Sequence, residues 1–223
     1  YHSYLYNAAV LTTLSYCPLD EAFRPGYSGS EKKLHLKSSI KKELLPQIPL
    51  TTRPSEAYLN GTMKIFQNVW IDHMNGDEYP RRIHPVRNMP NYGREIGTAV
   101  SEASCLLMLD YTEDQLEPLL VNFVQTGIDF YYMLESGRTW GNGGGHDNGR
   151  KWPMVFAGLM LDNEDMKNVM QTGKQLGSED TQTYYGQYKA LWGRNCYSPY
   201  TETCSGTVGS KDCRDSQGLK DGC

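Results

Sequence analysis

Apolar residues recur at intervals of three and four over much of the chain, which is the spacing of amphipathic helices. The clearest stripe comprises Ile96, Ala99, Val100, Ala103, Leu106 and Leu107. A second stripe covers residues 116–134, directly after Thr112-Glu113-Asp114-Gln115, which has the form of a helix capping box. The turn between the two is very short, so we expect an antiparallel helical hairpin that ends at Gly137.

A second hairpin is predicted further along the chain. Residues 154–161 are apolar almost all round, which is typical of a buried helix, and Pro153 suits a first helical turn. Asp162 or Asn163 can cap a further helix through Met170. Weaker patterns predict helices over residues 1–15, 30–45 and from Pro54 to about Met74.

No convincing strand pattern occurs before residue 180. The chain is therefore predicted to be mainly α-helical, with hairpins in which a more buried first helix precedes a more amphipathic second one. This alternation is what a toroid or solenoid of helical hairpins produces. We expect the hairpin domain to cover residues 1–180 and an irregular, Cys- and Gly-rich tail to cover residues 181–223.

The charge balance excludes several classes of protein. The 223 residues contain 22 Lys and Arg against 26 Asp and Glu, so the chain has no net positive charge that would attract nucleic acid or an anionic membrane. No apolar run reaches the ~18 residues of a membrane span. The 22 glycines and 16 tyrosines are more unusual, and they direct attention to particular loops and to the tail.

The six cysteines bear on the compartment. Four of them, Cys196, Cys204, Cys213 and Cys223, lie in the tail, and Cys17 and Cys105 lie in the helical part. Such clustering is typical of disulfides formed in an oxidising compartment, although the four tail cysteines allow three pairings. Free thiols in a cytosolic protein are the alternative. Asn60-Gly61-Thr62 is a glycosylation sequon, so we expect a secreted or extracellular glycoprotein.

Two polar loops precede the two helices that start at residues 96 and 154. The first loop, residues 81–95, reads Arg-Arg-Ile-His-Pro-Val-Arg-Asn-Met-Pro-Asn-Tyr-Gly-Arg-Glu. The second loop, residues 140–152, reads Trp-Gly-Asn-Gly-Gly-Gly-His-Asp-Asn-Gly-Arg-Lys-Trp. In an array of hairpins both fall at the end where helix N-termini present free N–H groups, which favour anions. The loops are therefore predicted to bind an acidic sugar.

Individual loop residues have a catalytic and a structural interpretation. His146 lies among glycines that let a ligand approach the backbone, or in a plain turn. Tyr92 is a candidate acid or base, or a packed aromatic. Arg94 and Arg150 are candidates to hold a carboxylate, or they form ordinary ion pairs with neighbouring acids. The candidate substrate-binding residues are His84, Arg87, Trp140, Asn142 and Trp152.

Several other chemistries lack their motif. The Gly-rich loop has no Gly-Lys-Ser/Thr ending, and neither His-Glu-x-x-His nor Gly-x-Ser-x-Gly occurs. The tail has no Cys-x-x-Cys pair and no His, which argues against zinc. We therefore predict no cofactor and no metal. The carboxylates available for glycoside hydrolysis are Glu95, Glu102, Asp129 and Asp147.

The runs 88–95 and 143–153 resemble segments of uncharacterised bacterial secreted proteins, which are themselves similar to helical-toroid polysaccharide lyases and six-hairpin glycosidases. The likeness covers about residues 45–185. It implies β-elimination on a uronate polymer, in which one group neutralises the carboxylate, a base removes the neighbouring proton and a Tyr protonates the leaving oxygen. The resemblance gives the neutralising role to Asn88, Arg94, His146 and Arg150, and the acid–base role to Tyr92 or His146.

A closed toroid of six hairpins has about twelve helices, more than this length holds at ~11 residues per helix plus loops. The chain also begins at Tyr1 without a signal segment, so we expect a processed chain, a fragment or a partial array. A lyase-like enzyme that binds an anionic polysaccharide is the leading interpretation. The alternatives are a self-assembling structural or interaction protein of an extracellular filament or matrix, and a glycoside hydrolase.

Overall fold

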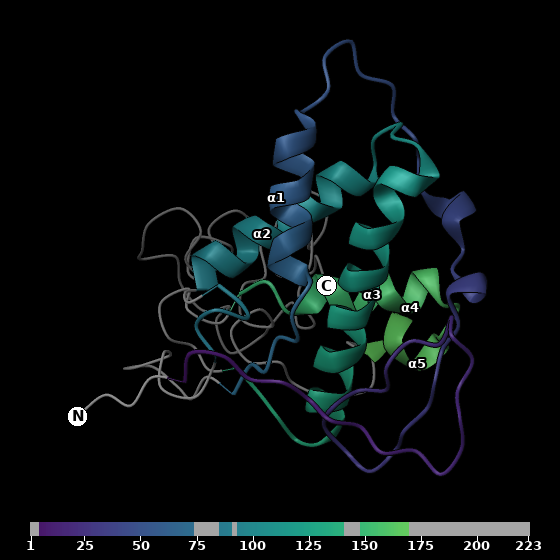
Figure 1. The fold of residues 1–223 in the computed structure, drawn as a ribbon, viewed down its shortest axis with the longest axis vertical. Coiled ribbons are helices and arrows are strands. Elements are labelled where there is room, and N and C mark those ends of the chain that lie inside the picture. The colour runs from purple at the N-terminus through teal and green to yellow at the C-terminus, as the bar shows by residue number, and fades with distance from the viewer. Residues whose placement is uncertain (1–4, 74–84, 91–92, 141–147, 170–223) are drawn as a thin grey trace, which may run out of the picture.

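The computed structural model describes residues 5–73, 85–90, 93–140 and 148–169 (Figure 1). This part of the chain is mainly helical and contains no strand, as predicted. The elements are η1 (Lys37–Ser39), η2 (Lys42–Leu44), α1 (Glu56–Phe66), α2 (Gly93–Leu107), α3 (Glu113–Glu135), α4 (Lys151–Met160) and α5 (Glu164–Lys167). None of these described helices is long and apolar enough to cross a membrane. The tail at 181–223, with its four cysteines, lies outside the described residues.

Helix α3 is the axis of the fold. It contacts α1, α2 and α4, and it packs most extensively against α4. Its apolar face is fully buried at Leu119, Phe123, Val124 and Ile128. The predicted capping box is present, because the Thr112 hydroxyl accepts from the Gln115 N–H while the Gln115 side chain accepts from the Thr112 N–H at 3.0 Å. A glycine with φ +88° ends this helix at position 137.

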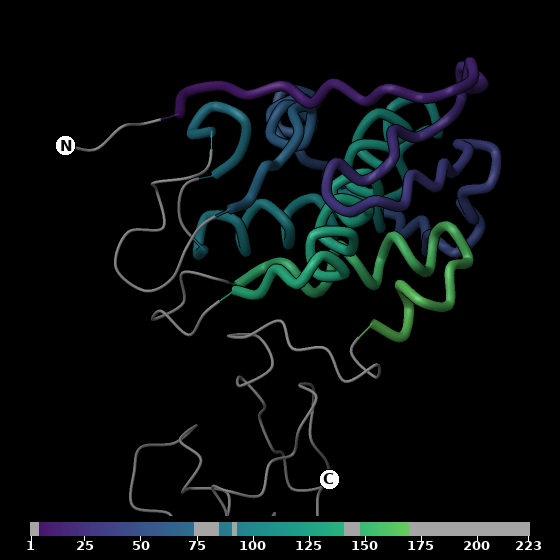
Figure 2. Tube along the Cα trace, turned by 90° about the horizontal axis from the view of Figure 1, so that it is seen from below, coloured from purple at the N-terminus to yellow at the C-terminus, as the bar shows by residue number. Residues whose placement is uncertain are grey.

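The pairing of the helices differs in part from the prediction. Helix α2 runs across α3 rather than antiparallel to it (Figures 1 and 2). The connection between them is held by the N-terminal segment, since Ile48 donates to the Met108 carbonyl at 2.7 Å and accepts from the Asp110 N–H at 3.1 Å. We expected the first helix of each hairpin to be the more buried one. Here the second helix, α3, is the more buried because it forms the axis of the fold. Helix α5 is a single turn capped by Asn163.

The helices predicted over residues 1–15 and 30–45 are wrong. Residues 5–50 form an extended segment with two short 3₁₀ turns, here called the strap, which runs along one side of the helices (Figure 2). Its backbone groups bond to distant segments instead of to the next turn. The Leu5 and Tyr6 carbonyls accept from Val86 and Arg87 at 3.0 and 2.9 Å, and Phe23 donates to the His35 carbonyl at 2.6 Å. Tertiary partners therefore override the weak helical spacing.

A connected set of aromatic rings fills the core. The set comprises Phe66, Trp70, Phe123, Phe130, Trp140 and Phe156, with ring centroids 4.7 to 6.0 Å apart. Trp70 also explains why α1 ends at Phe66 instead of continuing to about Met74. Its indole Nε1 donates to the Ile65 carbonyl at 2.9 Å, so the chain turns back at the last turn of the helix. The core thus links α1, α3 and α4 through large, interlocking side chains.

A glycine in α3 sets the distance to α4. A Cβ added at Gly127 would lie 2.0 Å from the Pro153 carbonyl oxygen and 2.7 Å from the Ala157 Cβ. We expect Gly127→Ala to lower the free energy of unfolding by about 3 kcal/mol, because α4 must move away. Gly61→Ala in α1, where nothing lies within 4 Å, should raise it by about 0.5–1 kcal/mol. Urea unfolding of both variants measures this, and a neutral Gly127→Ala would contradict the close packing.

Candidate functional site

A buried carboxylate, Asp72, joins the described ends of the second loop to the segment that leads into the first. Its Oδ2 accepts from the Trp140 Nε1 at 3.0 Å and from the Arg150 Nε at 2.8 Å. All three side chains have at most 1% of their surface exposed. Trp140 is the last described residue before 141–147, and Arg150 lies just after that gap. One carboxylate therefore holds both ends of the second loop.

Two arginines complete this cluster. Arg150 Nη1 donates to the Asn148 carbonyl at 2.7 Å, so its guanidinium bridges the Asp72 carboxylate and the loop backbone. Arg138 donates from Nε to the Asp72 carbonyl at 3.4 Å, and its guanidinium lies over the Trp140 ring at 5.7 Å. A buried ion pair adds little stability over apolar packing, but it fixes the geometry of the groups that it joins. Here those groups are the loop ends.

The second loop also meets the helix that follows the first loop. Gly149 adopts a φ of +92°, and a Cβ there would lie 3.0 Å from both the Gly97 backbone nitrogen and the Ile96 Cγ2. A larger residue is therefore excluded by both strain and space. Further along, the Trp152 Nε1 donates to the Ser104 hydroxyl at 2.7 Å. The C-terminal end of the second loop thus packs against α2, the helix that follows the first loop.

A second buried ion pair lies on α3. The Asp129 carboxylate is 1% exposed, and it accepts from the Arg24 Nη1 at 2.8 Å and also from Nη2. The Tyr27 N–H points to the same carboxylate at 3.4 Å. Burial raises the pKa of the Asp129 carboxyl, and the Arg24 guanidinium opposes this rise. The strap is therefore fastened to the axis helix by a partly exposed guanidinium that pairs with a buried carboxylate.

Tyr27 connects the two ion pairs. Its hydroxyl donates to the Met133 sulfur at 3.0 Å and lies 3.3 Å from the His73 Nε2. Burial raises the pKa of Tyr27, and the charges of Asp129 and Asp72 raise it further, so the phenol stays protonated. Tyr27 thus lies between the two ion pairs, with its backbone N–H toward Asp129 and its hydroxyl toward His73, the residue that follows Asp72.

Three of the predicted site residues lie inside the protein. Asn88 is 5% exposed, and its amide accepts from the Ala8 N–H at 3.2 Å and donates to the Ala8 and Val69 carbonyls at 2.7 and 3.0 Å. Arg150 and Trp140 face Asp72, as described above. These side chains hold the strap and the loops in place, which differs from the expected position at a ligand.

Three other candidates are exposed. Arg94 lies on the first turn of α2, Arg87 lies over the Tyr6 ring at 5.5 Å, and Trp152 is 42% exposed at the start of α4. Asn60 is also exposed, on α1. Cys17 and Cys105 are exposed and unpaired. The remaining candidates, Tyr92, His146, His84 and Asn142, lie outside the described residues.

Sequence reasoning missed the residues that build this centre. Asp72, Arg24, Tyr27 and Arg138 have no motif, and Asp129 was noted only as one of several carboxylates. A usable signal exists for the two acids, since each interrupts an apolar run that is otherwise typical of the core, and acids are almost never fully buried unless they are paired. The sequence does not identify their partners, which come from distant segments.

No group of three His, Cys, Asp or Glu side chains in the described part of the chain is placed to hold a metal ion. Comparison of the chain with protein families, curated proteins and solved structures finds no match. The functional argument therefore rests on the geometry of the loop ends and on the chemistry of the residues between them.

Removing the central carboxylate tests its role. Asp72→Asn removes the buried charge that pairs with the Arg150 guanidinium at 2.8 Å, so we expect a loss of about 3–5 kcal/mol in the free energy of unfolding. Asp110→Asn is the matched control, because its ion pair with Arg53 at 2.9 Å is partly exposed and should contribute less than about 1 kcal/mol. Chemical denaturation measures both, and equal losses would contradict the central role of Asp72.

His73 gives the fold a pH dependence. Burial lowers the pKa of His73 below its usual 6.5, and the Arg138 charge lowers it further. The stability from neutral His73 is thus fully present above pH 6.5 and is lost as the pH falls through the lower folded-state pKa. His35 is shifted in the same direction, chiefly by burial. We expect unfolding free energies between pH 7 and 5 to fall for the natural chain and to flatten stepwise in His73→Gln and His35→Gln/His73→Gln. An unchanged slope would contradict this assignment.

Proposed function

We propose that this protein is a polysaccharide-active enzyme of the lyase class that cleaves an acidic, uronate-containing glycan by β-elimination. The observation that carries the proposal is the packing of the second polar loop's described end against α2, the helix that follows the first loop. The Gly149 backbone packs against Gly97, and Asp72 binds Trp140 and Arg150 on either side of the second loop. Residues far apart in the chain are thereby held beside one helix start.

The reaction needs a cation for the substrate carboxylate. Arg94 is exposed on the first turn of α2, at the positive end of the helix dipole. A uronate carboxylate bound there loses negative charge to the Arg94 guanidinium, which makes the neighbouring C–H more acidic. We assign carboxylate neutralisation to Arg94, with His146 as a second donor.

Tyr92 and His146 supply the proton transfers in this proposal. One of them removes the proton on the carbon next to the carboxylate, and the electron pair forms a double bond as the neighbouring C–O bond breaks. The leaving oxygen takes a proton from the other group, so the substrate loses one proton at carbon and gains one at oxygen. Tyr92 directly precedes α2, and His146 belongs to the loop whose ends Asp72 holds. His84, Arg87, Asn142 and Trp152 remain proposed contacts along the glycan.

Asn88, Arg150 and Trp140 enter the proposal in positioning roles. Their polar groups are bonded inside the protein, so their effect on a substrate passes through the loops that they hold. The proposal keeps an extracellular location, a toroid-like array of helical hairpins and a disulfide-linked tail. The exposed side chain of Asn60 supports glycosylation at the sequon.

A second candidate function is assembly into an extracellular filament or matrix. It is favoured by exposed apolar side chains on the strap, namely Leu5, Tyr6, Leu11, Tyr16 and Leu19. Leu11 alone is 93% exposed, which is unusual for a side chain of this size in a row of such residues. Concentration-dependent light scattering without enzyme activity would favour this function.

Catalysis is tested with alginate, ulvan, glucuronan and glycosaminoglycans, by following the absorbance of the unsaturated uronate product. We expect activity on at least one polymer, and a loss of about 100-fold or more in Tyr92→Phe and in His146→Ala. Tyr58→Phe is the matched control, because Tyr58 is exposed on α1 and belongs to neither loop, and it should retain full activity.

Two outcomes would overturn the lyase proposal. The first is no new absorbance with any of these polymers. The second is release of reducing sugar without new absorbance, which identifies a glycoside hydrolase instead.

A further inference from the structure

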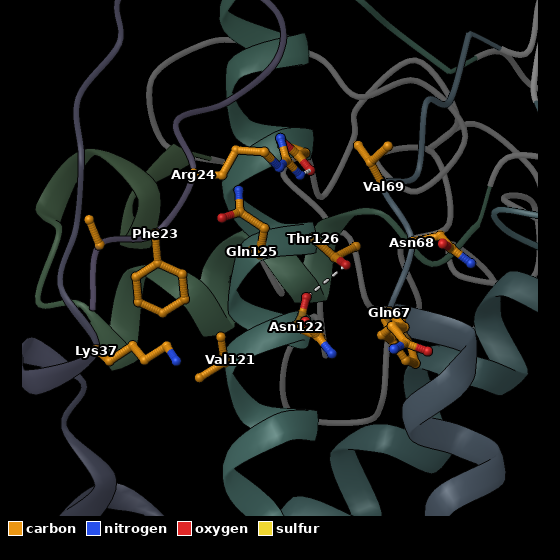
Figure 3. A pocket seen from close by; sticks show the side chains of 13 residues that line it. Phe23, Arg24, Lys37, Gln67, Asn68, Val69, Val121, Asn122, Gln125 and Thr126 are labelled. Atoms are coloured by element: carbon orange, nitrogen blue, oxygen red, sulfur yellow. Dashed lines mark hydrogen bonds and ion pairs between the residues drawn. The ribbon is translucent and has the colours of Figure 1, made fainter. Parts of the chain in front are cut away.

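A pocket of the molecule is lined by residues from outside both polar loops. It has a volume of about 240 Å³ and lies between the strap, the central part of α3 and residues 66–69 at the end of α1 (Figure 3). Figure 3 shows Phe23 and Lys37 on the strap side, Gln67 and Asn68 on the opposite side, and side chains of α3 between them. None of the lining residues belongs to either polar loop, so this pocket is distinct from the proposed cleavage site.

The charges around the pocket leave one positive charge uncompensated. Arg24 and Asp129 neutralise each other through their paired hydrogen bonds. Lys37 is half-buried, and its ammonium makes no hydrogen bond or ion pair with another residue of the described chain. Glu117, the acid on α3 that feels the Lys37 charge, is itself paired with Lys42 at 3.0 Å. An ammonium in such surroundings attracts a single negative charge.

The remaining polar groups are suited to hydroxyls. The side-chain amides of Gln67, Asn68 and Asn122 line the pocket, and none of them bonds to another described residue. Each amide offers both donors and an acceptor, and a sugar hydroxyl both donates and accepts. Phe23 and Phe66 add an apolar wall against which the C–H groups of a ring can pack.

We propose that this pocket binds one hydroxylated monocarboxylate, a free or terminal hexuronate, with its carboxylate on Lys37 and its hydroxyls on the three amides. The size agrees, because the pocket is smaller than the ~300–1,000 Å³ sites that enclose drug-sized ligands, and so it suits a single sugar unit. The charge favours a monocarboxylate over a phosphate dianion, because the pocket has one uncompensated positive charge.

The pocket is tested by calorimetric titration of the full chain with D-glucuronate, D-galacturonate, glucose and inorganic phosphate. We expect saturable binding of at least one uronate and weaker binding of glucose and phosphate. Lys37→Met should weaken uronate binding roughly tenfold or more, because it removes a charge-assisted hydrogen bond. Lys64→Met, an exposed lysine of α1 outside the pocket, is the matched control and should leave binding unchanged.

A second pair of variants tests the opposite wall. Asn68→Ala should weaken binding several-fold, whereas Asn60→Ala, an exposed position of α1, should not. The proposal is overturned if no uronate binds, if phosphate binds more tightly than either uronate, or if Lys37→Met binds like the natural chain. A chain that binds free uronate but leaves every polymer intact would keep this pocket and lose the proposed cleavage. A chain that cleaves polymer but does not bind free uronate would do the reverse.

Discussion

Asp72 places a negative charge where water does not reach it, and the arrangement of both polar loops depends on how that charge is satisfied. A buried carboxylate is unfavourable unless strong donors surround it. The Trp140 indole and the Arg150 guanidinium donate to the Asp72 carboxylate, and Arg138 donates to the Asp72 backbone carbonyl. These donors come from both sides of the Gly-rich loop. The requirement to neutralise one charge thus fixes where that loop leaves the core and where it re-enters it.

The aromatic core and the buried ion pairs stabilise different parts of the fold. Phe66, Trp70, Phe123 and Phe156 hold α1, α3 and α4 together by apolar packing, which tolerates many similar arrangements. The pairs formed by Asp72 and Asp129 accept few arrangements, because an unpaired partner would be costly. Packing therefore accounts for the compactness of the helices, and the ion pairs account for the placement of the strap and the loops.

The sequence predicts the local part of this structure well and the distant part poorly. Helices α2, α3 and α4 have strong apolar stripes, and the Thr112 capping box marks the start of α3 correctly. The strap has weaker helical spacing, and its Leu5 and Tyr6 carbonyls bond to the distant residues Val86 and Arg87, which no local pattern contains. The loops were found because their composition is unusual. The acids that hold the loops were not found, because the sequence does not show which distant residue pairs with a given Asp.

The strap also has a consequence for how the chain folds. Helical proteins fold quickly when their contacts are local. Here Arg24 and Asp129 are 105 residues apart, and Asn88 and Ala8 are 80 apart, so the strap must close very long loops. The strap is synthesised before the helices on which it docks, so its residues must wait for those helices. Until then the Asp129 carboxylate on α3 has no counter-charge, so docking of the strap is the step that commits the core to its final form.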